Sequence, residues 1–330
     1  MSKVHMLTTA DNSVDLHSRN DFKRLVASVP YDKFHKHELV EDPHRSDIIL
    51  FVGANFEDHR DVRAHPFYRQ FKEKCFLYYS NDFVIPFLPG VYVNIPKRWY
   101  STSRTRTGFY MRVFDEEYIE YQPNMESCEF LFCFIGSSQT HPVRSRVVTL
   151  RHPRAYVEDT SSVVPEEEKK KLFFMVNYGS NDNVRYGALL SKSKFVLCPR
   201  GYACSSWRLF ETMKAGRVPV IISDQWVPPE GPEWNTFSLR IAEKDVSQIP
   251  QILEQQESRA EVMGQLARRA WDEWFSRESS FHRIVEWCAE LQRAGKPSTI
   301  ANLSPHVQLL RPYFFRHVVL PRVKKRVFRS

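Results

Sequence analysis

One stretch in the second half of the chain, "SKFVLCPRGYACSSWRLFETMKAGRVPVIISDQW", carries the start and stop signals of three consecutive elements. Residues 194–198 are a short apolar run that ends at a proline. Ser205 or Ser206 is suited to cap the helix that follows, and Gly216 to close it in the left-handed conformation. Residues 218–223 form a second apolar run. This order predicts two parallel strands in one sheet, because a helical crossover returns the chain in the same direction.

The same alternation of strands and helices recurs along the rest of the chain. Apolar runs of strand length and stretches with a helical stripe predict further elements. The expected strands are 46–53, 75–80, 129–138 and 171–179, and the expected helices are 65–74, 258–275 and 279–295. The proline-rich stretch 81–108 is expected to be irregular. The pattern predicts the α/β class, with domains at 1–125 and 126–300 and a basic amphipathic tail at 301–330.

The formal net charge of +8 lies almost entirely in that tail. Residues 311–330 hold seven basic side chains and no acidic one, so the first 310 residues are close to neutral. A nearly neutral body argues against a nucleic-acid binder, which needs clustered cations. The tail can lie on an anionic lipid surface or pack back onto the body as a helix with a solvated basic face, and the sequence leaves both alternatives open.

The chain shows no secretory leader, and no window approaches the roughly 20 apolar residues of a membrane span. Its six cysteines have no metal-ligand spacing. We therefore expect reduced thiols and a cytoplasmic protein, with contact at the inner face of the membrane if the tail binds lipid.

The turn ahead of the 206–215 helix has the chemistry of an anion site. A helix N-terminus at the carboxyl edge of a parallel sheet presents N–H groups and a positive dipole. Gly201 lets a ligand approach the backbone closely, and Arg200 adds a cation. Arg208 and Glu211 share one face of the helix, so a cation for a diphosphate lies near a carboxylate for a ribose. The alternative is a surface ion pair worth about 0.3 kcal/mol.

The same stretch closely resembles the signature of the exostosin-like glycosyltransferases, which reads S-K-F, P-x-G, S-x-R-x-x-E and A-G-x-x-P-V-I-I-S-D. A weaker similarity is "FLFCFIGSSQTHPVRSRVV", which looks like the strand, glycine and arginine segment that opens the family's donor domain. The resemblance implies the GT-B fold, with two Rossmann-like domains facing a cleft and a helical C-terminal extension. It also implies inverting transfer from a nucleotide sugar, commonly a UDP-sugar.

Carried over by position, the resemblance makes Glu211 the carboxylate that binds the ribose. Arg208 and Arg144 match arginines that face the diphosphate, and Arg200 stands in the same turn. Gly201, Ser205 and Ser206 shape the phosphate turn. The sequence has no Asp-x-Asp motif, so we predict transfer without a metal or cofactor, in which arginines and a helix N-terminus stabilise the leaving diphosphate.

The catalytic base is expected in the N-terminal half. Asp82 follows one predicted strand, and Asp58 or His59 follows another. Asp82 is the preferred candidate, although an aspartate after a strand is commonly an ordinary turn residue.

The segment 177–187 is either a plain turn or part of the donor pocket through Asn177, Arg185 or Tyr186. His141 and His152 are expected to be structural or solvent-facing.

Four functions remain as alternatives at this level. The first is transfer from a UDP-sugar to a glycan or glycolipid acceptor. The second is transfer from a GDP-sugar, since α-fucosyltransferases share a related segment. The third is a catalytically silent nucleotide-sugar-binding or scaffold protein, and the fourth, nucleic-acid binding, is disfavoured by the neutral body.

Overall fold

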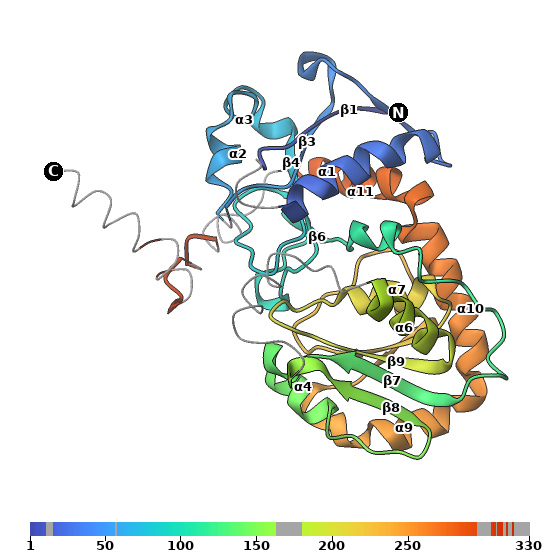
Figure 1. The fold of residues 1–330 in the computed structure, drawn as a ribbon. Coiled ribbons are helices and arrows are strands. Elements are labelled where there is room, and N and C mark those ends of the chain that lie inside the picture. The colour runs from blue at the N-terminus through green and yellow to red at the C-terminus, as the bar shows by residue number, and fades with distance from the viewer. Residues whose placement is uncertain are drawn as a thin grey trace. The chain divides into compact units, whose positions relative to one another are not determined.

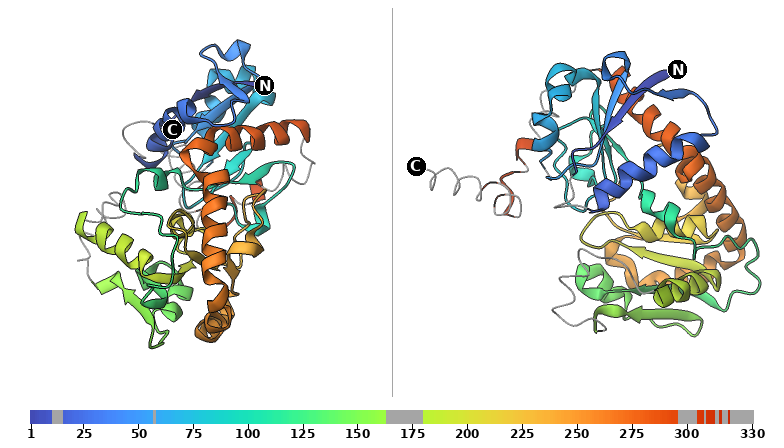
Figure 2. Two further views of the ribbon diagram at one scale, coloured as in Figure 1. Left: turned by 90° about the vertical axis from the view of Figure 1, so that its right-hand side faces the viewer. Right: turned by 45° about the horizontal axis from the view of Figure 1, so that its top comes forward.

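A computed structural model describes residues 1–10, 16–56, 58–162, 180–295, 305–307, 309–312, 315 and 319. The chain divides into two compact units. The first unit comprises residues 1–29, 34–108 and 281–330, and the second comprises residues 30–33 and 109–280. The strands of the first unit are blue to cyan in Figures 1 and 2, and those of the second are green to yellow.

The first unit is built on a six-stranded sheet in the order β2-β1-β3-β4-β5-β6, and all its pairs are parallel. Its strands are β1 (Ser2–Leu7), β2 (His37–Leu39), β3 (Ile48–Val52), β4 (Cys75–Tyr79), β5 (Gly90–Tyr92) and β6 (Thr105–Thr107). Its helices are α1 (Leu16–Ser28), α2 (Arg60–Ala64) and α3 (Pro66–Gln70). Every residue of β3 and β4 is buried, as expected for central strands of a parallel sheet covered on both faces.

The second unit is built on a five-stranded parallel sheet in the order β11-β10-β9-β7-β8. Its strands are β7 (Phe130–Gly136), β8 (Ala155–Asp159), β9 (Ser193–Pro199), β10 (Val218–Ile222) and β11 (Leu239–Arg240). Its helices are α4 (Pro142–Val147), α6 (Ser180–Ser191), α7 (Trp207–Lys214), α8 (Trp234–Phe237), α9 (Ile249–Gln256) and α10 (Ala260–Ala270). α11 (Arg277–Arg293) begins in this unit and continues into the first from residue 281.

Both sheets have a doubly wound strand order. In each unit the second strand along the chain pairs with one side of the first strand, and the third strand pairs with the other side. This confirms the predicted α/β class and two parallel sheets. The predicted strands 46–53, 75–80 and 129–138 are β3, β4 and β7, and the predicted strand 171–179 lies outside the described residues.

The structure places the division of the chain elsewhere than at residue 125. Residues 109–125 belong to the second unit, where Phe109 packs against Phe210 and Phe275 with ring centroids 6.2 and 5.3 Å away. α11 from residue 281 belongs to the first unit, where Gln292 donates to the Asp47 carbonyl at 3.1 Å. Both assignments depend on contacts far apart in sequence, which local patterns do not reveal.

Two local expectations also need correction. The proline-rich stretch 81–108 is not wholly irregular, because it contains the buried strands β5 and β6. Each strand has only three residues, too few for a periodic signal to stand out from the surrounding turns. The last long helix begins at Arg277 rather than at the serine expected to cap it, and Gly295 follows it with a φ of +78°.

The C-terminal residues that are described contact the first unit. Leu309 packs against its core, the His306 ring lies 5.2 Å from that of Phe87, and the Arg311 guanidinium lies 5.5 Å from the Trp99 ring centroid. Most of the predicted basic tail lies outside the described residues. Within the part of the chain that is described, no helix is both long and apolar enough to span a bilayer.

Candidate functional site

The strand order of the second unit brings two predicted segments together. β7 and β9 are neighbours, and the chain leaves β7 towards β8 on one side and β9 towards β10 on the other. The carboxyl ends of two such strands are where open α/β sheets bind ligands. Residues after β7 lead into α4, and residues 200–206 connect β9 to α7. Figure 1 shows β7 and β8 pointing towards α4.

Arg144 of α4 holds the turn that follows β9. Its Nε donates to the carbonyl oxygen of Arg200 at 2.9 Å, and its Nη2 donates to that of Pro199 at 3.2 Å. Gly201 lies close to this side chain, since an added Cβ would be 3.2 Å from Arg144 Nη2 and 3.4 Å from Thr140 Oγ1. The predicted arginine and glycine therefore meet, and the arginine also fixes the backbone of the turn.

The turn ends in two buried serines at the start of α7. Ser206 occupies the predicted N-cap position with extended backbone, but its side chain makes no capping hydrogen bond. The hydroxyl groups of Ser205 and Ser206 are both buried and have no hydrogen-bond partner among the described residues. Buried hydroxyl groups normally find a partner. The start of α7 thus presents two hydroxyl groups together with the positive end of a helix dipole.

Arg208, in the first turn of α7, lies over the end of β7. Its guanidinium carbon is 5.5 Å from the Phe134 ring centroid, and that of Arg144 is 5.9 Å from the same ring. A Cβ added to Gly136 would lie 2.7 Å from Arg208 Nη2, so the glycine makes room for this guanidinium. Arg144 and Arg208 are 8% and 7% exposed. Two largely buried guanidinium groups therefore lie near the switch point between β7 and β9.

Arg200 also lies at this turn, and its guanidinium bonds to carbonyl oxygens of its own loop. The Nε donates to Gly201 at 3.4 Å, and the Nη2 donates to Tyr202 at 3.3 Å. The side chain is half-buried. The seven predicted binding residues thus lie on three neighbouring segments: four in the turn after β9, Arg144 on α4, and Arg208 and Glu211 on α7.

Glu211 lies one turn further along α7 and is 2% exposed. Its surroundings are polar, since the Tyr186 hydroxyl donates to its Oε2 at 3.0 Å and its carboxyl shares a hydrogen bond with that of Glu116. Burial, followed by the neighbouring Glu116 carboxyl, raises the pKa of Glu211 well above its ordinary value. The neutral form of Glu211 is therefore favoured in the folded chain.

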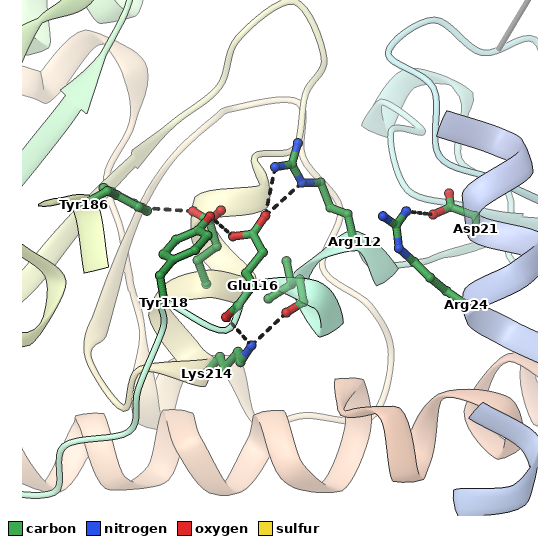
Figure 3. A network of polar contacts seen from close by, with 9 residues as sticks. Asp21, Arg24, Arg112, Glu116, Tyr118, Tyr186 and Lys214 are labelled. Carbon is green, nitrogen blue, oxygen red and sulfur yellow. Dashed lines mark hydrogen bonds and ion pairs between the residues drawn. The ribbon is translucent and has the colours of Figure 1, made fainter. Parts of the chain in front are cut away.

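Glu116 is the centre of this network, which Figure 3 shows. Arg112 donates to Glu116 Oε1 from Nε and Nη2, both at 2.9 Å, and the Tyr118 hydroxyl donates to Oε2. Lys214, at the end of α7, donates to the Glu116 carbonyl at 2.7 Å. Burial lowers the pKa of Lys214. The network ties the segment 109–125 to the helix that carries Arg208 and Glu211.

Sequence reasoning missed Arg112, Glu116 and Tyr118. They lie in the segment assigned to the N-terminal domain, and "MRVFDEEYIEYQPN" has no periodicity or motif that sets it apart. Tyr186, which was one of three alternatives in 177–187, does join the site through Glu211. Arg185 instead pairs with Glu158 and Tyr156, and Asn177 lies outside the described residues.

Asp159 at the end of β8 was also missed, and it supports the loop after β7. Its carboxylate accepts from the backbone N–H and the hydroxyl of Ser138 at 3.0 and 2.6 Å, and from the hydroxyl of Ser161 at 2.6 Å. Burial raises the pKa of Asp159, but these hydrogen bonds outweigh it and lower the pKa to about 2. Asp159 therefore remains ionised and fixes the loop that leads to Arg144.

The candidates for the catalytic base all lie in the first unit. Asp82 is exposed in the turn after β4. Asp58 and His59 follow β3 and are 1% and 0% exposed. His59 has a φ of +52°, its Nδ1 contacts the Phe56 carbonyl at 3.1 Å, and burial lowers its pKa to about 4. Of the three, only Asp82 has a side chain that a substrate can reach without rearrangement.

His141 and His152 both make local structural contacts. His141 caps α4, accepting from the Val143 N–H at 3.2 Å. His152 contacts Glu254 at 3.1 Å through Nε2 and accepts from the Arg154 N–H through Nδ1.

Comparison with known proteins agrees with the resemblance in the signature segment. The model of the exostosin GT47 domain matches residues 80–256, more than half of the chain. An exostosin-1 homologue of Caenorhabditis elegans is 38% identical over 94 residues, which are 28% of this chain and 25% of that protein. Exostosin-1 of Drosophila melanogaster is 28% identical over 177 residues, which are 51% of this chain and 22% of that protein. The chain thus spans about a quarter or less of the length of these relatives.

Among solved structures, Anabaena HepE in complex with UDP and glucose is similar at a TM-score of 0.44 and 9% identity, covering 88% of this chain and all of that one. A likeness of this degree has no bearing on activity. The extent of the domain match, which includes β7, the turn after β9 and α7, shows that the chain belongs to the exostosin GT47 family.

Proposed function

We propose that this chain is a glycosyltransferase that moves a sugar from a nucleotide-sugar donor, a UDP-sugar, to a hydroxyl group of a glycan or glycolipid. The observation that supports this best is the start of α7, where two buried serine hydroxyl groups without a described partner lie on the helix that also carries Arg208. Unsatisfied donors, a helix N-terminus and a guanidinium together suit a diphosphate. Membership of the exostosin GT47 family points to the same chemistry.

In this proposal the donor's diphosphate binds over the turn 200–206. The hydroxyl groups of Ser205 and Ser206 and the guanidinium of Arg208 donate to its oxygens. Arg144 shapes the turn and adds positive charge beside it. These groups stabilise the charge that develops on the departing diphosphate, which is the role that a bound metal has in other transferases. We therefore propose a transfer that requires no metal or cofactor at this site.

Glu211 is proposed to hold the ribose. Its Oε2 already accepts a hydrogen bond from the Tyr186 hydroxyl, so this oxygen can accept one from a ligand hydroxyl. A ribose hydroxyl would take the place of the Tyr186 hydroxyl on this oxygen. The nucleotide would then extend from the start of α7 towards its second turn, with the diphosphate at one end and the pentose at the other.

The reaction is proposed to invert the anomeric carbon in a single displacement. The acceptor oxygen forms a bond to the anomeric carbon as the bond from that carbon to the diphosphate oxygen breaks. The acceptor proton passes to a base, for which Asp82 is the candidate, and the nucleoside diphosphate leaves with the bonding electron pair.

We propose a cytoplasmic location for this reaction, with the basic residues 311–330 contacting the inner face of a membrane.

A thermal-shift panel with UDP, GDP, CDP and ADP tests the nucleotide site. A ligand that binds only the folded state raises the melting temperature by mass action, so we expect the largest shift with UDP. Replacing Arg208 by Met should remove a charged hydrogen bond to the diphosphate and weaken binding about tenfold or more. Arg154→Met is the matched control, because Arg154 is exposed in the same unit and pairs with Glu257.

The outcomes separate the alternatives. A larger shift with GDP would assign the donor to the GDP-sugars. A shift with UDP but no release of UDP from any UDP-sugar would indicate a catalytically silent binding protein. No shift with any nucleotide, or equal loss of the shift in both arginine variants, would contradict the proposed site.

A further inference from the structure

The first unit contains a cluster of two histidines and a glutamate that glycosyl transfer does not use. His282 and Glu286 are four residues apart on α11, so their side chains lie on one face of the helix. His37 begins β2, the edge strand of the six-stranded sheet. One ligand atom from each residue lies within 4.8 Å of the other two, and His37 Nε2 is 3.1 Å from Glu286 Oε1.

The surroundings of the cluster orient its rings. The Phe34 ring stacks on His282 with centroids 4.1 Å apart and an interplanar angle of 24°. The His37 ring stacks on the same imidazole at 5.1 Å and 25°, and Phe281 meets His37 edge-on at 6.3 Å. His282 is 3% exposed, and the side chain of His37 is 2% exposed. The two imidazoles are therefore held in a dry, aromatic environment.

From this geometry we propose that His37, His282 and Glu286 form a Zn²⁺ site. Two imidazole nitrogens and one carboxylate oxygen are a donor set that zinc prefers, with a water molecule completing a tetrahedron. Ligands about 2.0–2.1 Å from a tetrahedral zinc lie about 3.4 Å from one another. His37 and Glu286 are close to that spacing, and the ligand atom of His282 lies within 4.8 Å of both.

The neighbouring Arg293 favours the required orientation of the carboxylate. Its Nη2 lies 3.7 Å from Glu286 Oε2, the oxygen that does not face His37. A partner on the second oxygen leaves Oε1 directed at the metal, which is how outer groups commonly orient metal-binding carboxylates.

The zinc site would have a structural role. β2 has three residues and, among the described strands, pairs with β1 alone, through three residue pairs. His37 and His282 are 282 − 37 = 245 positions apart in the sequence, so a shared metal closes a long loop between the sheet edge and α11. Closing a long loop restricts the unfolded chain more than closing a short one. The metal would fix the terminal helix to the sheet of the first unit, independently of any transferase activity.

Zinc binding can be measured on the full chain after dialysis against a chelator. We expect titration calorimetry with ZnCl₂ to give one tight site, and Co²⁺ to give the visible absorption of a four-coordinate ion. Saturating Zn²⁺ should raise the melting temperature by about 3 °C or more. His37→Ala, His282→Ala and Glu286→Gln should each weaken binding at least tenfold and abolish the shift.

His152→Ala is the matched control. His152 Nε2 contacts Glu254 Oε1 at the same 3.1 Å, but no second histidine lies in that pair, so this variant should bind Zn²⁺ like the wild type. Glu286 is 33% exposed, so Glu286→Gln keeps the test valid if a histidine variant fails to fold. The proposal is overturned if the wild type shows no zinc-dependent shift, or if Glu286→Gln binds Zn²⁺ as tightly as the wild type.

Discussion

Replacing Gly136 by Ala should damage nucleotide binding far more than it damages folding. The added Cβ would lie 2.7 Å from Arg208 Nη2 and 3.1 Å from Phe134 Cζ. Ordinary contact begins near 3.4 Å, so the guanidinium must retreat by about 0.7 Å (3.4 − 2.7). A displacement of this size breaks the geometry of a hydrogen bond to a phosphate oxygen.

The steric cost of the added methyl group and the gain from replacing a glycine in a strand oppose each other, so the loss of stability is small. An extra methyl group in a packed site typically costs about 1–3 kcal/mol, but here the obstacle is the end of a flexible side chain. Replacing a strand glycine returns about 0.5–1 kcal/mol. We expect a net loss of about 1 kcal/mol or less, which lowers the melting temperature by about 2–4 °C. Losing one charged hydrogen bond costs about 1.5–3 kcal/mol of binding, or about 10- to 100-fold in Kd.

The assay is UDP titration by calorimetry, with the melting temperature measured in parallel. Gly108→Ala is a matched steric control in the first unit, since its Cβ would lie 2.8 Å from Val91 Cγ1. That variant should lose stability and keep the wild-type affinity for UDP. If Gly136→Ala binds UDP as tightly as the wild type, Arg208 does not contact the diphosphate and the site as argued is wrong.

Three further predictions concern the second unit. Gly264→Ala should lower the free energy of unfolding, measured by urea titration, by about 2 kcal/mol. The new Cβ would clash with the backbone oxygen of Gly216, and this clash outweighs the gain of about 1 kcal/mol in helix propensity. A variant as stable as the wild type would contradict this. Burial and a neighbouring carboxyl raise the pKa of Glu211, so its contribution to the free energy of unfolding is complete below about pH 4.5 and is lost as pH rises. The urea midpoint of Glu211→Gln should therefore rise relative to that of the wild type from about pH 5 to 9. Parallel curves for the two proteins would refute the shift. Burial raises the pKa of Asp159, but hydrogen bonds outweigh it and lower the pKa from 3.8 to about 2. The contribution of Asp159 to stability is therefore present above pH 4 and lost between pH 4 and 2, so Asp159→Asn should be less stable than the wild type at pH 7 and equally stable near pH 2. An equal loss of stability at both pH values would contradict this prediction.

The structure changes how Glu211 is understood. The sequence leaves Glu211 either as a carboxylate for a ribose or as one member of a surface arginine–glutamate pair. The structure instead buries it against Tyr186 and a second carboxyl group from residues 109–125. The burial of α7 decides this, since all six residues from Arg208 to Met213 are buried. Helical spacing identifies which side chains are neighbours, but not which face the fold covers.

The sequence by itself determined the local elements around β9 and α7. The strand before Pro199, the N-cap position at Ser206, the helix after it and the left-handed Gly216 all lie where residue types predict them. Each depends on backbone preferences that act within a few residues, so a short window contains the whole cause. The family signature is equally local, because it lies within one strand–helix–strand unit.

Only the tertiary structure decided which distant residues meet. Arg144 reaches the carbonyls of Arg200, Glu116 reaches Glu211, and His37 reaches His282 on a helix 245 positions later. It also assigned residues 109–125 to the second unit and α11 from residue 281 to the first. These contacts follow from strand order and helix packing, which depend on the burial of whole faces rather than on any local pattern of residues.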